Sequence, residues 1–139
     1  MTLLRWRDSL SLNVPVIDAD HKRLFELLNR LRFLDLAGDE PSAVEEALSD
    51  LLLYTQTHFR REERLMMLGG YPLLHQHQRA HRQFTDRVAG IAARYHSNPK
   101  AFSVRVFYEM LSDWLVDHVL GDDMRIKPWI AHLEESQAA

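Results

Sequence analysis

The chain has 139 residues, 46% hydrophobic and 27% charged, which is long enough and apolar enough for one domain with a real core. Its formal net charge of -3 gives no electrostatic reason to expect nucleic acid or a membrane surface as a partner. Because cysteine is absent, disulfides and thiolate chemistry are excluded, and any metal would need nitrogen and oxygen ligands. The N-terminus lacks the apolar run of a signal peptide, and no stretch approaches the roughly 20 apolar residues of a membrane span. We therefore expect a soluble, cytoplasmic protein.

The chain opens with an arm that leads into a first helix. Residues 1–17 are expected to be extended, because Pro15 disfavours helical backbone in the residue before it. Asp18 suits the N-cap of a helix over about residues 19–36, which Gly38 would end. The inward stripe of this helix comprises His21, Leu24, Leu28 and Leu31.

Two longer helices follow, over about residues 41–68 and 72–95, separated by Gly69-Gly70-Tyr71-Pro72. On both, the inward positions recur in alternating steps of three and four residues, the period of a helix-bundle seam. The first seam comprises Val44, Leu48, Leu51, Thr55, His58, Glu62 and Leu65. The second comprises Leu74, His77, His81, Phe84, Val88, Ile91 and Tyr95. Histidine and glutamate thus occupy positions where leucine would be expected.

A fourth helix is expected over about residues 101–120, after the turn at Ser97-Asn98-Pro99. Its seam comprises Val104, Phe107, Leu111, Trp114 and His118. Residues 124–139 form a tail that suits a short extra helical segment. Four amphipathic helices joined by short turns predict an all-α fold, an up-down-up-down antiparallel four-helix bundle with an extended N-terminal arm, in a single domain over residues 1–139.

Polar side chains on the seams gather at one end of such a bundle, because neighbouring helices run antiparallel. They are His21, His58, Glu62, His77, His81 and His118, with Asp123 just beyond. One inward histidine is usually a hydrogen-bonded core residue. A fold stable by about 5–15 kcal/mol, however, could not tolerate six such positions without compensation. Metal ions compensate them together, and imidazole with carboxylate suits iron, manganese or zinc.

The number of these ligands exceeds what one ion with an open position needs, so two ions are expected. Ferritin-type two-metal bundles use Glu-x-x-His pairs, and this sequence contains none. The expected site is therefore rich in histidine and poor in carboxylate.

The spacing of His118 and Asp123 conflicts with a regular helix. Residues five apart are about 140° apart around an α-helix with 3.6 residues per turn. Both side chains can face one site only if the helix ends or widens, and Gly121 lies between them. We therefore predict a loosened turn around Leu120 to Asp123.

Several motifs resemble those of bacterial hemerythrins, and together they span nearly the whole chain. They are Trp6, Pro-Val-Ile-Asp-Ala-Asp-His (15–21), His-Phe-x-x-Glu-Glu (58–63), Tyr71-Pro72, His-x-x-x-His-x-x-Phe (77–84) and His-x-x-x-x-Asp (118–123). One departure is Asn13-Val14, where relatives often carry glycine; it affects the arm and not the ligands. Myohemerythrin is itself a four-helix bundle, so the resemblance and the seams indicate the same fold.

The resemblance implies a site of two non-haem irons joined by an oxo or hydroxo bridge. The implied ligands are His77, His81 and His118 on one iron, His21 and His58 on the other, and Glu62 and Asp123 bridging both. One position would stay open on the two-histidine iron, where molecular oxygen would bind reversibly as a hydroperoxide. By position, the oxygen pocket would be lined by Phe59, Trp114, Leu115 and Val119, which also suit ordinary core packing.

The function expected from this resemblance is oxygen carriage, storage or delivery, with no catalytic residues. The alternatives are a di-iron peroxidase, oxidase or nitric oxide reductase, or an oxygen or redox sensor. An enzyme would need a proton donor, for which Tyr54, Tyr71 and Glu63 are candidates, or an electron-donor protein partner. Sensors are commonly fused to signalling domains, which this sequence does not show.

Overall fold

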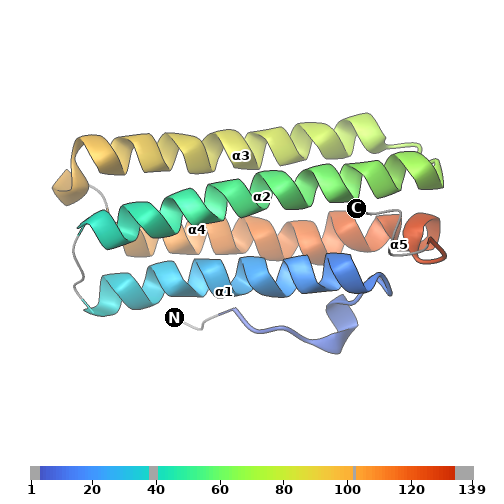
Figure 1. Ribbon diagram of the computed structural model, residues 1–139, viewed down its shortest axis with the longest axis horizontal. Helices are drawn as coiled ribbons and strands as arrows, with labels where there is room; N and C mark the ends of the chain where they lie inside the picture. Colours follow the sequence, from blue (N-terminus) through green and yellow to red (C-terminus); the bar gives the residue numbers. More distant parts are fainter. Residues whose placement is uncertain (1–3, 38–40, 102, 134–139) are drawn as a thin grey trace.

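The computed structural model describes residues 4–37, 41–101 and 103–133. Within these ranges the chain is all-helical, and its four long helices lie side by side in one antiparallel bundle (Figure 1). The long helices are α1 (Pro15–Ala37), α2 (Pro41–Gly69), α3 (Leu74–Ser97) and α4 (Val104–Asp117). A short α5 (Met124–Ile130) folds over the end where α2 finishes. The predicted all-α four-helix fold is confirmed.

The seams predicted from the sequence form the core. On α2, every seam residue from Val44 to Leu65 is buried. On α3, the seam is buried from His77 to Tyr95. Because α1 packs on α2 and α4, and α3 packs on α2 and α4, the four apolar faces enclose a single interior. In the described part of the chain, no helix is long and apolar enough to cross a membrane.

The beginning of α1 differs from the prediction. The helix starts at Pro15 and not near Ala19, because proline has no N–H to lose and suits the first helical position. Asp18 is therefore not the N-cap. Its carboxylate accepts hydrogen bonds from the backbone N–H of Leu12 at 2.8 Å and the Ser11 hydroxyl at 2.5 Å. Asp18 instead ties the arm to the first turn of α1.

The arm itself is only partly extended. It contains a 3-10 turn, η1 (Asp8–Leu10), and then runs directly into α1. Asn29 of α1 binds the beginning of the arm at Leu4. Its side-chain NH2 donates to the Leu4 carbonyl at 2.8 Å, and its side-chain oxygen accepts from the Leu4 N–H at 3.0 Å. The Tyr108 hydroxyl of α4 also donates to Asn29, at 2.9 Å. Residues 1–3 of the predicted arm lie outside the described residues.

Two further helices start later than predicted. The third begins at Leu74 and not at Pro72, because Gly70 has a φ of 73° and the following residues form a turn. The fourth begins at Val104 and not near Ala101. A 3-10 turn, η2 (Pro99–Ala101), comes first, and the Ser103 hydroxyl then caps the helix by accepting from the Val106 N–H at 3.3 Å.

The predicted widening at the end of α4 is confirmed. Residues His118–Asp123 form a π-helix, η3, before α5 continues the chain. A π-helix joins residues five apart, so His118 and Asp123 come onto one face. Gly121 does not cause this through a left-handed backbone, since Gly70 is the one described glycine with positive φ. The distortion therefore starts two residues earlier than Leu120 and contains Gly121 without a left-handed backbone there.

Candidate metal centre

The seven predicted ligands meet at the end of the bundle where α1 and α3 begin and α2 finishes. Figure 1 shows α5 at this end of the bundle. All seven are buried, with 0% to 5% of their surface exposed. They are His21 of α1, His58 and Glu62 of α2, His77 and His81 of α3, and His118 and Asp123 of η3. The fold therefore brings all the predicted ligands together.

The carboxylate of Glu62 lies between two groups of imidazoles. Its Oε1 is 2.8 Å from His77 Nε2 and 3.1 Å from His81 Nε2. Its Oε2 is 3.4 Å from His21 Nε2 and 3.3 Å from His58 Nε2. Each oxygen thus faces a different group of histidines, which is the placement that a bridging carboxylate requires.

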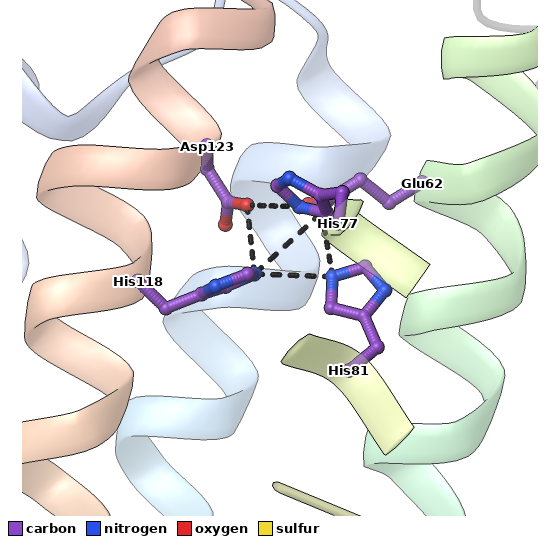
Figure 2. Close-up of side chains that lie close together, drawn as sticks. All are labelled: Glu62, His77, His81, His118 and Asp123. Atoms are coloured by element: carbon purple, nitrogen blue, oxygen red, sulfur yellow. Dashed lines mark hydrogen bonds and ion pairs between the residues drawn. The ribbon is translucent and has the colours of Figure 1, made fainter. Parts of the chain in front are cut away.

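Asp123 is divided in the same way. Its Oδ1 is 3.0 Å from both His77 Nε2 and His118 Nε2, whereas its Oδ2 is 3.1 Å from His21 Nε2. Figure 2 shows the larger group, in which His81 Nε2 and His118 Nε2 are also 3.0 Å apart. Two groups of donor atoms result, each compact enough to hold one metal ion, and both carboxylates belong to both groups. We call these the three-histidine group and the two-histidine group.

Outer carboxylates orient three of the imidazoles. They contact the Nδ1 atoms: Asp20 with His58 at 3.0 Å, Glu63 with His81 at 2.8 Å, and Asp122 with His118 at 3.1 Å. An Nδ1–H that donates to a carboxylate leaves the Nε2 lone pair free to point inward. These roles of Asp20 and Asp122 were not predicted. The sequence offered one signal for these roles: Asp20 directly precedes His21, and Asp122 follows His118 by one helical turn.

Asp20 is the most deeply placed of these outer carboxylates, at 2% exposed. It also accepts hydrogen bonds from the Tyr54 hydroxyl at 2.7 Å and from Arg61 Nη1 at 2.7 and 2.8 Å. Burial by itself raises the pKa of Asp20, but the hydrogen bond and charge of His58, with Tyr54 and Arg61, lower it overall. Asp20 is therefore an ionised carboxylate held in place to orient His58.

The electrostatics of the site favour positive charge. Burial alone would lower the pKa of His21 and His77, but the adjacent carboxylates of Asp123 and Glu62 outweigh it and raise both pKa values to about 9. Burial alone would also lower the pKa of His118, but the negative charge of Asp123 outweighs it and raises this pKa to about 10. The pKa values of Glu62 and Asp123 are lowered although burial raises them, because imidazoles surround both carboxylates. In the metal-free chain, protons thus supply positive charge that bound cations can replace.

Four buried polar atoms of the site have no hydrogen-bond partner in the described part of the chain. They are Nδ1 and Nε2 of His21, Oε2 of Glu62 and Oδ2 of Asp123. Three of them face one another within the two-histidine group, and unpaired buried polar atoms are costly. One cation among those three would satisfy them together, so the residues present fit a metal. A donor set of imidazole and carboxylate without thiolate suits iron, manganese or zinc.

The residues predicted to line a ligand pocket are Phe59, Trp114, Leu115 and Val119. Phe59, Leu115 and Val119 belong to the main core cluster, and the partly buried Trp114 packs against it. The ring of Phe59 stacks on His81, with centroids 3.7 Å apart and planes at 2°. Trp114 stacks on His118, with centroids 4.6 Å apart and planes at 14°. These two aromatic rings therefore cover one face each of the His81 and His118 imidazoles.

The three predicted proton-donor candidates all lie at the edge of the site. Tyr54 donates to Asp20, and Glu63 contacts His81. The ring of Tyr71 meets His77 edge-on, with centroids 6.3 Å apart. The histidines off the seams, which are His75, His96 and His132, are exposed.

A four-helix bundle whose interior holds two groups of potential metal ligands, sharing two carboxylates, defines a helical metal-binding protein. The family model described as the Hemerythrin HHE cation binding domain matches residues 12–130. The chain therefore belongs to the hemerythrin family, as its motifs indicated.

Individual relatives agree with this family. The chain is 36% identical to a bacteriohemerythrin of Stenotrophomonas maltophilia over 136 residues, which are 97% of this chain and 87% of the relative. It is 34% identical to a bacteriohemerythrin of Pseudomonas aeruginosa over 123 residues, 88% of this chain and 78% of the relative. A crystal structure of wild-type hemerythrin superposes with a TM-score of 0.85 and 26% identity, covering 94% of this chain and 99% of that one.

Proposed function

We propose that this chain is a non-haem di-iron protein that binds molecular oxygen reversibly, as a carrier, store or delivery protein. The proposed iron ligands are His77, His81 and His118 on one ion, His21 and His58 on the other, and Glu62 and Asp123 between them. The observation that carries this proposal is the division of each carboxylate, one oxygen toward each histidine group. An oxo or hydroxo bridge would complete the pair and leave one position open on the two-histidine side.

Bound irons would supply the electrons that oxygen takes up. The chain's own contribution is to orient the ligands and to keep water away from them. All the proposed ligands are buried, and the rings of Phe59 and Trp114 stack on the imidazoles of His81 and His118. An apolar surrounding limits the protons that could drive oxygen chemistry further, which favours reversible binding over turnover.

We also propose that residues 1–139 form a single hemerythrin-like domain. The family match over residues 12–130 includes α1 to α5 completely. The arm before this match is attached to the bundle through Asn29 and Tyr108.

A redox enzyme using the same site is the second candidate, because the site has a route toward the surface. A cleft of about 440 Å³ lies beside α2 and α3, and its lining includes Phe59, Glu63 and His81. Glu63 contacts a proposed ligand on one side and borders this cleft on the other. A peroxidase, oxidase or nitric oxide reductase could receive protons there, with electrons from a protein partner, and a sensor could use the same exposure.

An anaerobic optical titration with oxygen tests the proposed function. We expect the reduced, iron-loaded protein to contain two irons per chain and to develop a new absorption band with oxygen that fades when argon removes it. The buried, apolar surroundings are the reason to expect such reversibility. Direct passage to a ferric spectrum that argon does not reverse would favour the redox enzyme or sensor. Absence of iron would reject the choice of metal.

Asp20→Asn is expected to weaken iron binding by about 10- to 100-fold, the usual effect of losing an outer partner of a metal-bound histidine. Asparagine keeps the shape but removes the charge that orients His58 and binds Arg61. Iron retention during competition with a chelator measures the effect. Asp50→Asn is the matched control, because Asp50 forms an exposed pair with Arg30. Equal iron retention by Asp20→Asn and the wild type would contradict the proposed role.

A further inference from the structure

One hydroxyl buried in the bundle is unpaired among the residues that the structure describes. Thr55 of α2 is 0% exposed, and its Oγ1 has no hydrogen-bond partner within the described residues. Other helix threonines behave differently: Thr57 donates to the Leu53 carbonyl at 3.0 Å, and Thr85 donates to the His81 carbonyl at 2.9 Å. A buried hydroxyl without a hydrogen-bond partner is unfavourable, so the presence of threonine at this position requires an explanation.

Thr55 lies next to the two-histidine group. It precedes His58 by one helical turn on the same seam, about 4.5 Å along the helix axis. On the neighbouring helix α1, Leu24 lies one turn inward from His21, and it is also fully buried. The rings of His21 and His58 are 4.7 Å apart, so the two helices place these side chains in one layer. Thr55 and Leu24 are therefore the next residues inward from the two-histidine group.

The carboxylates leave this inward side uncovered. Glu62 follows His58 by one turn toward the end of the bundle, and Asp123 follows His118 in the same direction. The aromatic rings of Phe59 and Trp114 stack on His81 and His118, and Phe59 meets the ring of His58 only at a tilt, with centroids 5.7 Å apart. A free coordination position on the two-histidine side would thus face the layer that contains Thr55.

We propose that the Thr55 hydroxyl donates a hydrogen bond to a small anionic ligand at that position, and so determines ligand affinity. This inference rests on the proposed function, because it requires iron at the two-histidine group. A threonine hydroxyl can rotate to suit an incoming acceptor, and hydrogen bonds to charged acceptors are stronger than those between neutral groups. Thr55 and Leu24 are both fully buried, so the ligand would be the acceptor that the hydroxyl lacks in the free protein.

Azide binding to the oxidised, iron-loaded protein tests this proposal, because azide is a small anion whose binding to ferric iron is followed by absorbance. Thr55→Val keeps the shape and removes the donor. We expect it to weaken azide binding by about tenfold or more, whereas Thr55→Ser should retain most of the affinity. Thr57→Val is the matched control, since its hydroxyl is already bound to a backbone carbonyl. Its azide affinity should equal that of the wild type.

A second measurement separates this role from a structural one. Thermal unfolding of the metal-free protein should occur at the same or a higher temperature in Thr55→Val, because no existing hydrogen bond is lost. Unchanged azide affinity in Thr55→Val, or a lowered melting temperature, would overturn the proposal. If the wild type itself takes up no iron, the proposed function fails instead. If the wild type binds azide and Thr55→Val binds it equally well, only the role of Thr55 is rejected.

Discussion

Glu62→Ala is expected to reduce the iron content from two per chain to one or fewer. Both oxygens of Glu62 contact histidine nitrogens, two in each group, so one substitution removes a ligand from both proposed metal positions. The imidazoles would also lose a negative charge that favours a cation over an empty site. Iron counted per chain after anaerobic loading and desalting measures the loss.

The matched control for this variant is Glu26→Ala. Glu26 is a glutamate on α1 that is 66% exposed and pairs only at the surface, with Arg23. The Glu26→Ala protein should keep the full iron content. Circular dichroism would establish that Glu62→Ala remains helical, so that loss of iron is not loss of the fold. A folded Glu62→Ala protein that holds two irons per chain would refute the assignment of Glu62 as a bridge.

Metal removal is expected to lower the melting temperature, and the difference between loaded and metal-free protein should grow as the pH rises from 6 to 9. In the metal-free protein, the pKa values of His21 and His77 are raised from 6.5 to about 9, and that of His118 to about 10. Their ion pairs therefore contribute fully below pH 6.5, and this stability is lost as the pH rises through 9 to 10. Metal ligands must be deprotonated, so metal binding strengthens over the same range.

Thermal unfolding of both forms at several pH values measures this prediction. We expect the metal-free melting temperature to fall by roughly 5 °C or more between pH 6 and pH 9. Glu62 and Asp123 act in the opposite direction: their lowered pKa values give stability that is present above about pH 4.5 and lost on acidification. A metal-free protein whose stability is constant or increases from pH 6 to pH 9 would contradict the ion pairing described.

The amino-acid sequence by itself determined the bundle and which side chains meet at its predicted metal site. Alternating steps of three and four residues identify one face of each helix, and short turns force neighbouring helices to be antiparallel. Those two facts were enough to bring His21, His58 and His118 to one end. The five-residue step from His118 to Asp123 also predicted a widened helix, since no regular α-helix could place both on one face.

Only the tertiary structure decided how the side chains are shared. Helical periodicity tells which face a residue occupies but not which residue of another helix it meets, because that depends on the distance and rotation between packed helices. The contact of Asp20 with His58 crosses from α1 to α2, and the two oxygens of Glu62 meet imidazoles from different helices. The unpaired hydroxyl of Thr55 is likewise visible only once every neighbour has been placed, since an absent partner leaves no pattern in a sequence.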